Sequence, residues 1–326
     1  MGLLAAWQGT PHCTIRVPPE GGFGVAAEQV CPEEAALRLA AFPKCYLDAL
    51  VTDRSMTVFD WIALARQLQP FGVTGLELYT GFLDIDDPAS LRAVRRALDE
   101  AGFAMPMLCA SPDFTWPNPA DRHREVGRHR LAIEAAATLG ARTCRVLSGQ
   151  RRPEVRREEG IAWVVECIQA LLPHAATNGI VLAIENHFKD NFWTWPEFAQ
   201  TSDRFCAIVD RVRSPWFGVN FDPSNALLAG EDPLGLLERV KHRVVSMHAS
   251  DRRLRPGARV GPEGLTEYAQ LIHGEVGTGL IDYDAVFAVL RAVGFDGWVS
   301  IEDGLNGMEE LKRSAMFLAR RMGLNA

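Results

Sequence analysis

The 326-residue chain lacks the paired cysteines and the long apolar runs that mark several protein classes. Its seven cysteines are odd in number and scattered, without a Cys-x-x-Cys pair, which is typical of free thiols in a reducing cytosol. No apolar stretch approaches the roughly 20 residues of a membrane span. The N-terminus has neither the basic region nor the apolar run of a signal peptide. We therefore expect a cytoplasmic protein with no membrane partner.

Positive charge is also scarce, because the formal net charge is -7 at pH 7. Nucleic-acid binding needs a basic surface, so we expect no nucleic-acid partner. Two short basic clusters, at residues 151–157 and at Arg252–Arg253, are typical of loop charges or substrate contacts. No Gly-x-Gly-x-x-Gly motif follows an early strand, which argues against a dinucleotide-binding fold.

Apolar strand-like segments alternate with helical patterns through most of the chain. This alternation predicts a parallel sheet, and eight strands over this length favour a closed (β/α)₈ TIM barrel, an α/β fold. We assign residues 44–326 to this catalytic domain. Residues 1–43, rich in Gly and Pro, are expected to form an N-terminal extension with a weakly helical piece at Glu33–Ala41. The expected strands are Cys45–Leu50, Gly75–Tyr79, Met105–Ala110, Thr143–Leu147, Ile180–Glu185, Phe217–Asp222, Val244–His248 and Trp298–Glu302.

Helix boundaries are marked by capping residues. Thr57 and Asp60 form a capping-box-like start. Asp87-Pro88 opens the next helix, and Gly102 closes it. A long loop at Asp251–Gly279 is expected on the catalytic face of the barrel, where such loops shape the pocket.

Four metal-compatible side chains end four successive apolar strands in the second half of the chain. They are Glu185, Asp222, His248 and Glu302. Strands side by side in a barrel bring such side chains together at the C-terminal rim, where barrels carry their chemistry. Three carboxylates and one imidazole suit Mn²⁺, Mg²⁺, Co²⁺ or Zn²⁺. We predict one shared divalent-metal site.

Other polar residues near the strand ends are candidates for roles around this site. Arg145 lies in an expected strand and is costly to bury unpaired, so we expect it to contact a carboxylate or the substrate. His187 is a candidate acid/base. Glu77 either orients a metal ligand or forms a structural ion pair. Arg253 is a candidate contact to a substrate hydroxyl or phosphate.

Aromatic residues occur in the long loop that follows the third expected strand. Trp116, with Phe114, either stacks on the face of a sugar or anchors the loop itself. The sequence leaves both readings open.

Four stretches together resemble the xylose-isomerase-like TIM barrels. More narrowly, they resemble the sugar phosphate isomerase/epimerase group, which includes ketose 3-epimerases and inosose dehydratases. The resemblance covers about residues 44 to 322. The stretches are Val181–His187, Gly218–Asn225, Met247–Asp251, and Gly277–Tyr283 leading into Gly297–Glu302.

The resemblance implies one divalent ion, most often Mn²⁺, held by Glu185, Asp222, His248 and Glu302. In the epimerases the two matching glutamates also face each other across the substrate and exchange protons with it. The epimerases often have a His three residues after the Asp ligand, where this chain has Asn225. Asn225 is therefore the expected substrate contact here, and it weakens the case for a simple ketose 3-epimerase.

The leading hypothesis is a metal-dependent isomerase or epimerase that removes a proton next to a carbonyl of a sugar or polyol derivative. The alternative is a lyase on an oxidised sugar, because a stabilised enediolate can also lose a substituent. Inosose dehydratases and the barrel subunits of C-glycoside deglycosidases, which act on 3-oxo-glycosides, resemble the chain in this way. The deglycosidase reading would bring a small partner subunit, whereas a homo-oligomer is the other assembly left open.

Two further classes are less compatible with the sequence. Endonuclease IV shares the barrel but draws extra His ligands from early strands, which here end at Tyr79 and near Cys109. The acidic charge also argues against a nuclease. A non-catalytic binding barrel would not need the intact set of four ligands.

Overall fold

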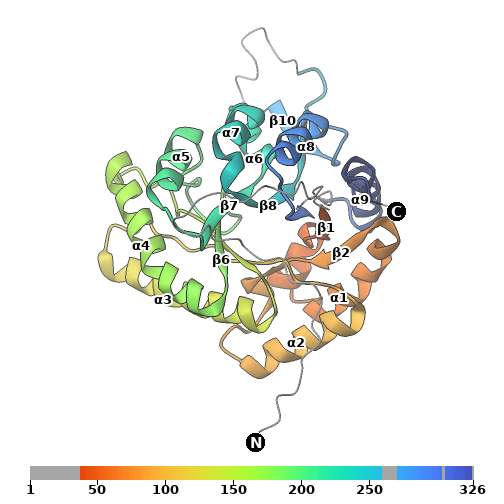
Figure 1. The fold of residues 1–326 in the computed structure, drawn as a ribbon, viewed down its shortest axis with the longest axis horizontal. Coiled ribbons are helices and arrows are strands. Elements are labelled where there is room, and N and C mark those ends of the chain that lie inside the picture. The colour runs from red at the N-terminus through yellow and green to blue at the C-terminus, as the bar shows by residue number, and fades with distance from the viewer. Residues whose placement is uncertain (1–36, 259–269, 303–304, 325–326) are drawn as a thin grey trace, which may run out of the picture. The chain divides into compact units, whose positions relative to one another are not determined.

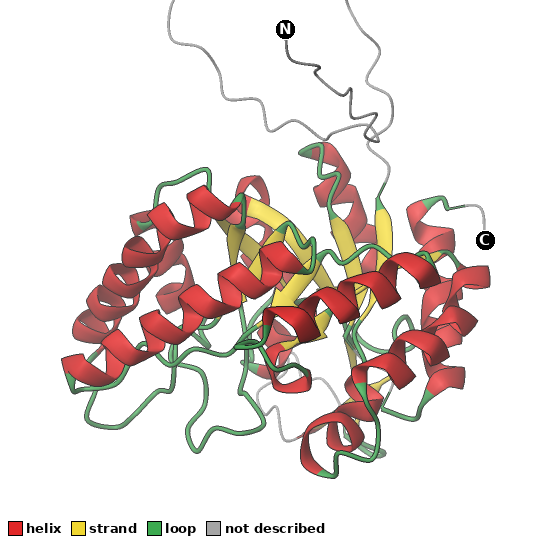
Figure 2. Ribbon diagram, turned by 90° about the horizontal axis from the view of Figure 1, so that it is seen from below, coloured by secondary structure: helices red, strands yellow, loops and turns green. Residues whose placement is uncertain are grey.

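The computed structural model describes residues 37–258, 270–302 and 305–324. Parallel strands lie at the centre and helices surround them (Figure 1). A view turned by 90° shows the helices on the outside of the sheet (Figure 2). The predicted TIM barrel is therefore confirmed, as a nearly closed barrel of parallel strands.

Nine strands fill the eight positions of the barrel, because the second position is split. β2 pairs with β1, β3 pairs with β4, and Glu77 lies between β2 and β3. The order around the sheet is β2-β1-β11-β8-β7-β6-β5-β4-β3, and every pair is parallel. The strands are β1 (Arg38–Ala41), β2 (Val73–Leu76), β3 (Leu78–Tyr79), β4 (Met107–Cys109), β5 (Thr143–Val146), β6 (Val181–Glu185), β7 (Phe217–Phe221), β8 (Val244–Ala249) and β11 (Trp298–Ile301).

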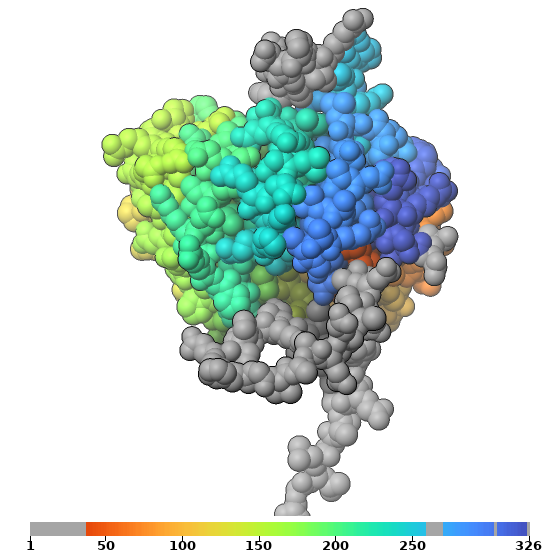
Figure 3. Space-filling view, turned by 45° about the horizontal axis from the view of Figure 1, so that its top comes forward, coloured from red at the N-terminus to blue at the C-terminus, as the bar shows by residue number. Residues whose placement is uncertain are grey.

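The helices form the outer layer of the barrel (Figure 2), and in the space-filling view the segments coloured from green to blue cover one face of the molecule without a break (Figure 3). Thr57 and Asp60 form the predicted capping box, and Trp61 behind it is fully buried. No helix within the described ranges is long and apolar enough to cross a membrane. The helices are α1 (Val58–Ala65), α2 (Pro88–Ala101), α3 (Pro119–Thr138), α4 (Arg157–Asn178), α5 (Ser202–Arg211), α6 (Pro223–Leu228), α7 (Pro233–Val240), α8 (Tyr283–Ala292) and α9 (Met308–Met322).

Burial explains why the strands read as continuous apolar runs rather than alternating ones. Every residue of β6 and β7 is buried, since one face of each strand meets the barrel interior and the other meets a helix. The ends of such strands can therefore carry a charged side chain only where it is paired or ligated.

The prediction of a first strand at Cys45–Leu50 is wrong. Lys44–Tyr46 is a 3₁₀ turn and Asp48–Thr52 a π turn, whereas β1 is Arg38–Ala41. The Leu-Ala-Ala run of β1 lies in the segment that was expected to be weakly helical. Ala favours helices intrinsically, but pairing with both β11 and β2 overrides that preference. Residues 1–36 of the expected extension lie outside the described residues.

The segment after β8 contains regular structure where a loop was expected. β9 (Asp251–Leu254) and β10 (Leu271–Gly274) form an antiparallel ribbon. Gly277, Gly279 and Ile281 donate their backbone N–H groups to Asp251, which ties the end of this segment back to its start. The ribbon thus extends β8 beyond the rim of the barrel.

Candidate metal centre and active site

The four predicted ligands converge at the C-terminal rim of the barrel. Glu185 ends β6, Asp222 follows β7, His248 lies in β8 and Glu302 follows β11. These four strands are consecutive neighbours in the sheet. One candidate ligand atom from each residue lies within 4.8 Å of those of the others, and the residues are between 0% and 6% exposed. We call Glu185, Asp222, His248 and Glu302 the tetrad.

The residue after Glu185 sets the position of Asp222. The Asn186 side-chain amide donates to the Asp222 carbonyl at 2.6 Å and accepts from the Asp222 N–H at 2.8 Å. This two-bond clamp joins the ends of β6 and β7 in a buried environment. Asn186 therefore fixes the backbone of one ligand from the strand that carries another.

The two carboxylate oxygens of Asp222 have different environments, because one of them accepts several hydrogen bonds. Its Oδ1 accepts the N–H groups of Ser224 and Asn225 at the start of α6, and the Ser250 hydroxyl at 2.8 Å. Oδ2 is left for a ligand. Burial, and then the nearby charges of Glu302 and Glu185, raises the Asp222 pKa to about 6. A cation among these carboxylates would remove that penalty.

His248 is oriented from behind by Glu77. Its Nε2 lies 2.8 Å from Glu77 Oε2, and both side chains are fully buried. Glu77 lies at the break between β2 and β3, where it can reach across the barrel interior. The N–H is therefore expected on Nε2, which leaves the lone pair of Nδ1 facing the tetrad. Cys109 Sγ also approaches Glu77 Oε2, at 3.8 Å.

The surroundings of His248 Nδ1 show whether the site fits a metal ion. Nδ1 is buried and has no hydrogen-bond partner within the described residues, although it lies 3.4 Å from Glu302 Oε2 and 3.6 Å from Glu185 Oε1. An unpaired buried nitrogen facing carboxylate oxygens is the arrangement expected of a ligand set. The donors fit one hard or borderline divalent ion.

Arg145 is buried beside the tetrad, as the sequence suggested. Its Nη1 donates to Glu185 Oε2 at 2.9 Å and lies 3.8 Å from Glu302 Oε1. Its Nε donates to the Ala110 carbonyl and its Nη2 to Ser111 Oγ. Burial alone would raise the pKa of Glu185, but the charges of Arg145 and His248 outweigh it and lower that pKa to about 2.

Asn225 contacts the second oxygen of the same glutamate. Its Nδ2 donates to Glu185 Oε1 at 3.1 Å. Glu185 thus accepts a hydrogen bond on each oxygen. Among the residues that the structure describes, the groups that approach Glu302 Oε1 are the cations Arg145, at 3.8 Å, and Lys44, at 3.6 Å. Burial raises the pKa of Glu302, but Lys44 and His248 lower it well below its usual range.

A small pocket lies beside Glu302 of the tetrad, and we call it the mouth. His187 lies in its wall, with Nδ1 3.6 Å from Oε2 of the buried Glu197. The pKa of His187 is raised because Glu185 and Glu197 outweigh the lowering by burial. The mouth is lined by Phe42, Lys44, Leu47, Tyr79, Arg145, His187, Lys189, Asp190, Asn191, Phe192 and Glu302.

Sequence reasoning missed Lys44 and Glu197. Lys44 was placed at the start of the barrel domain with no role, because β1 was not recognised and the residues after it were read as a strand. Glu197 lies in the segment between β6 and α5, where no strand end marks it. An isolated Glu in such a segment gives no sequence signal of burial.

The structure does not bring Trp116 or Arg253 to the mouth. The Trp116 ring stacks on the Arg152 guanidinium, whose carbon lies 3.8 Å from the ring centroid, and Phe114 is fully buried. These contacts favour the reading in which both aromatics anchor the loop. Arg253 is exposed on β9 and donates to the His273 carbonyl. A substrate contact by either residue stays a prediction.

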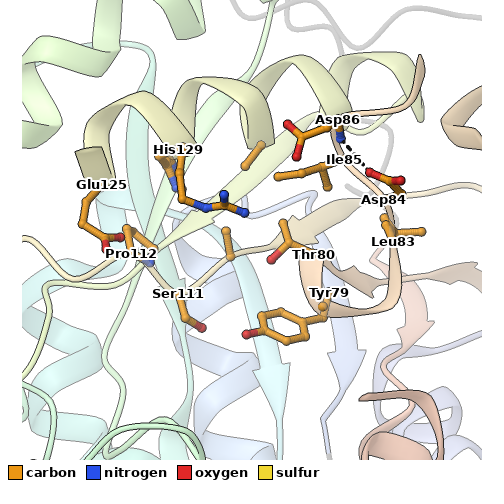
Figure 4. A pocket seen from close by; sticks show the side chains of 14 residues that line it. Tyr79, Thr80, Leu83, Asp84, Ile85, Asp86, Ser111, Pro112, Glu125 and His129 are labelled. Atoms are coloured by element: carbon orange, nitrogen blue, oxygen red, sulfur yellow. Dashed lines mark hydrogen bonds between the residues drawn. The ribbon is translucent and has the colours of Figure 1, made fainter. Parts of the chain in front are cut away.

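A larger cavity of about 350 Å³ lies beside the mouth and shares Tyr79 with it. The Tyr79 and Ser111 side chains lie on one side of this cavity, and Glu125 and His129 project into it from α3 (Figure 4). It contains no member of the tetrad. The tetrad therefore reaches the mouth through Glu302, and the larger cavity adjoins the mouth through Tyr79.

Comparisons with known proteins identify the family of the chain. A model of the family described as xylose isomerase-like TIM barrel matches residues 65–321. The 3-oxo-isoapionate decarboxylase of Pectobacterium atrosepticum is 26% identical over 226 residues, 64% of this chain and 75% of that protein. The putative L-ribulose-5-phosphate 3-epimerase SgbU of Escherichia coli is 26% identical over 223 residues, which cover 63% of this chain and 68% of that protein.

A solved structure adds a zinc-binding example of the same fold. The IOLI protein with a bound zinc atom superimposes with a TM-score of 0.62, at 18% sequence identity, over 88% of this chain and 95% of that one. At that identity the likeness shows the fold alone. The curated relatives are enzymes of the epimerase and decarboxylase type.

Proposed function

Because this chain belongs to the xylose isomerase-like TIM barrel family, we propose that it is a divalent-metal-dependent enzyme that moves a proton next to a carbonyl group of a sugar or sugar derivative, as an isomerase or epimerase. The convergence of the tetrad around the unpaired Nδ1 of His248 carries this proposal. The similar SgbU protein, a putative 3-epimerase, supports it.

The residues that would hold the ion are Glu185, Asp222, His248 and Glu302. We propose Mn²⁺ as the resident ion, with Mg²⁺, Co²⁺ or Zn²⁺ as compatible alternatives. A divalent ion bound there supplies positive charge that stabilises negative charge developing on a substrate oxygen.

The chain's own residues would position the substrate and carry the proton. Glu302 lines the mouth with its Oε1 near Lys44, and it can accept a proton from the carbon next to a substrate carbonyl. His187, held against Glu197, lines the mouth, where it can donate a proton to a substrate oxygen. Glu185 is held by Arg145 and Asn225, and it keeps a fixed position between them.

The second candidate is a lyase, and the hydrogen bonds on Glu185 favour it. Epimerisation needs an acid/base on each face of the carbon, and the resemblance assigns those roles to Glu185 and Glu302. A carboxylate whose two oxygens accept hydrogen bonds from Arg145 and Asn225 is poorly placed for the second role. Loss of carbon dioxide from a 3-oxo sugar acid forms the enediolate without a base and then needs one proton donor, and the similarity to a decarboxylase fits this reading. Loss of water needs one base for the carbon-bound proton and one acid for the leaving hydroxyl, which Glu302 and His187 could supply.

Two measurements test the proposal. Elemental mass spectrometry of the purified protein should find about one divalent ion per chain, and His248→Ala should lose it. His273→Ala is the matched control, because His273 also pairs with a buried glutamate, Glu310, outside the tetrad. The metal-loaded protein should then exchange substrate carbon-bound hydrogen with D₂O when ketoses and oxo-sugars are screened by NMR. Absence of metal even after reconstitution would overturn the proposal.

A further inference from the structure

The mouth contains two lysines that donate no hydrogen bond to any residue the structure describes, although Lys44 forms a long ion pair with Glu302. Lys44 Nζ lies 3.6 Å from Glu302 Oε1, which is outside hydrogen-bond range, and its side chain is 27% exposed. Lys189 is exposed, and none of its contacts within the described ranges is an ion pair or a hydrogen bond. Both line the mouth next to Glu302.

The other charged groups of the mouth are already committed. Arg145 donates from Nε, Nη1 and Nη2 to Ala110, Glu185 and Ser111. Asp190 accepts from the Ser111 hydroxyl at 2.7 Å and from the Phe192 N–H at 2.9 Å. Beside His187, the two lysines are therefore the cationic side chains of the mouth that keep N–H groups for an incoming molecule, Lys44 through its long contact with Glu302 and Lys189 through its exposure.

We propose that Lys44 and Lys189 bind a carboxylate group carried by the substrate, so that the substrate is a sugar acid rather than a neutral sugar. This inference rests on the proposed function, since it names the substrate class of the same mouth. A neutral sugar is held by hydroxyl, amide and aromatic groups, and it gains nothing from two ammonium groups in the mouth. A carboxylate forms charge-assisted hydrogen bonds with both.

The surroundings of the lysines favour a carboxylate over a phosphate. Proteins usually hold a phosphate dianion with Arg forks, backbone N–H groups or a helix N-terminus. The Arg145 fork is occupied, and the first N–H groups of α6 are taken by Asp222 itself. The Asp190 carboxylate also lines the mouth, which disfavours a dianion more than a monoanion.

Apolar side chains beside the lysines strengthen this interaction. Phe42 and Leu47 line the mouth on the side of Lys44, and Phe192, which is 56% exposed, follows Lys189 at the rim. Apolar groups exclude water from a bound carboxylate, and a lower local dielectric increases its attraction to the ammonium groups. The apolar rim and the two cations together match the hydrocarbon skeleton and the carboxylate of an acid.

The test uses three ligands that share one ketose skeleton and differ only at carbon 6. D-Fructose has a hydroxymethyl group there, D-fructuronate a carboxylate and D-fructose 6-phosphate a phosphate. Each is titrated by calorimetry into the manganese-loaded and the chelator-treated protein. Fructuronate is expected to bind about tenfold more tightly than fructose, as charge-assisted contacts to two lysines would give.

Substitutions assign the preference to the lysines. Lys44→Met and Lys189→Met should each remove most of it, and the double variant all of it. Lys241→Met is the matched control, because Lys241 lies before β8 at the opposite end of the barrel and pairs with Glu238. Equal binding of the three ligands, no binding of fructuronate, or an unchanged preference in the double variant would overturn the inference. Tighter binding of the phosphate would overturn the choice of a carboxylate.

Failure of the proposed function is seen separately. A lysine-dependent preference for fructuronate in a protein that takes up no metal and exchanges no substrate hydrogen would leave the anion site standing and remove the enzyme proposal. Metal-dependent hydrogen exchange on neutral ketoses, without any preference for the acid, would do the reverse.

Discussion

Replacing Glu77 by Gln should weaken metal binding, although Glu77 is not one of the four proposed ligands and acts through His248. Glu77 Oε2 lies 2.8 Å from His248 Nε2, and both side chains are fully buried. Glu77 thereby holds the ring in place, keeps the proton on Nε2 and makes Nδ1 a stronger donor. Gln has the same shape and can still accept the hydrogen bond, but it lacks the charge.

The expected loss is about tenfold in metal affinity, at the lower end of the 10–100-fold range for residues that support a ligating His. Glu77→Leu should lose more, because it also leaves the buried His248 N–H without a partner. The dissociation constant for Mn²⁺ or Zn²⁺ is measured by competition with a chelator of known affinity. Thermal unfolding of the metal-free proteins checks that each variant is folded.

Glu310→Gln is the matched control for this experiment. Glu310 is buried and its Oε1 lies 2.5 Å from His273 Nε2, so it forms the same kind of pair outside the tetrad. Its replacement should leave metal affinity unchanged. A Glu77→Gln protein that binds metal as tightly as the wild type would show that the Glu77–His248 contact has no role in preparing the ligand.

Two further predictions concern stability. Burial lowers the pKa of His129 to about 3 from 6.5, so the unfolded chain binds more protons between these values and stability is lost as the pH falls through this window. Lowering the pH from 7.5 to 5 should cost about 2 kcal/mol through this residue, and urea unfolding of His129→Gln should lack that part of the loss. Arg152→Met should cost about 3 kcal/mol in the same assay, because it leaves the buried Asp113 carboxylate unpaired. An unchanged unfolding midpoint would contradict either statement.

The tetrad could be predicted from the sequence because its members lie at, or directly after, the C-terminal ends of strands. In a parallel barrel the chain position at the C-terminal end of a strand is also a position on the rim, so four carboxylate or imidazole groups after four apolar runs must approach one another. The pairing of Arg145 followed from the cost of burying an unpaired charge. Both inferences needed only the periodicity and the residue type.

The parts that could not be predicted depend on tertiary contacts. β1 is short and contains two alanines, and its pairing with β11 and β2 decides its conformation rather than its own propensity. Lys44 reaches Glu302 only because β1 places it at the rim. Glu197 is buried and contacts Ser148 and His187. Ser148 follows β5, and His187 follows β6. Such tertiary contacts cannot be predicted from local sequence patterns.

The different environments of the two glutamates decide what chemistry the tetrad supports. Glu185 accepts hydrogen bonds on both oxygens, whereas the contacts of Glu302 Oε1 within residues 37–258, 270–302 and 305–324 are two longer ones with cations, and Glu302 lines the mouth. We therefore expect one mobile base rather than two equivalent ones. A single base suits isomerisation, where a proton leaves and returns on one face, or a lyase reaction, better than epimerisation.

This asymmetry gives a comparison within the tetrad. At saturating metal, Glu302→Gln should reduce hydrogen exchange with D₂O by at least about a hundredfold, the contribution expected of a general base. Glu185→Gln keeps a hydrogen-bonding group in a residue with a fixed position, so its loss should be smaller once metal is saturating. Metal content measured in both variants separates the base from the ligand role. Equal losses in exchange would mean that both glutamates carry protons. Epimerisation would then be favoured over a single-base reaction, despite the hydrogen bonds on Glu185.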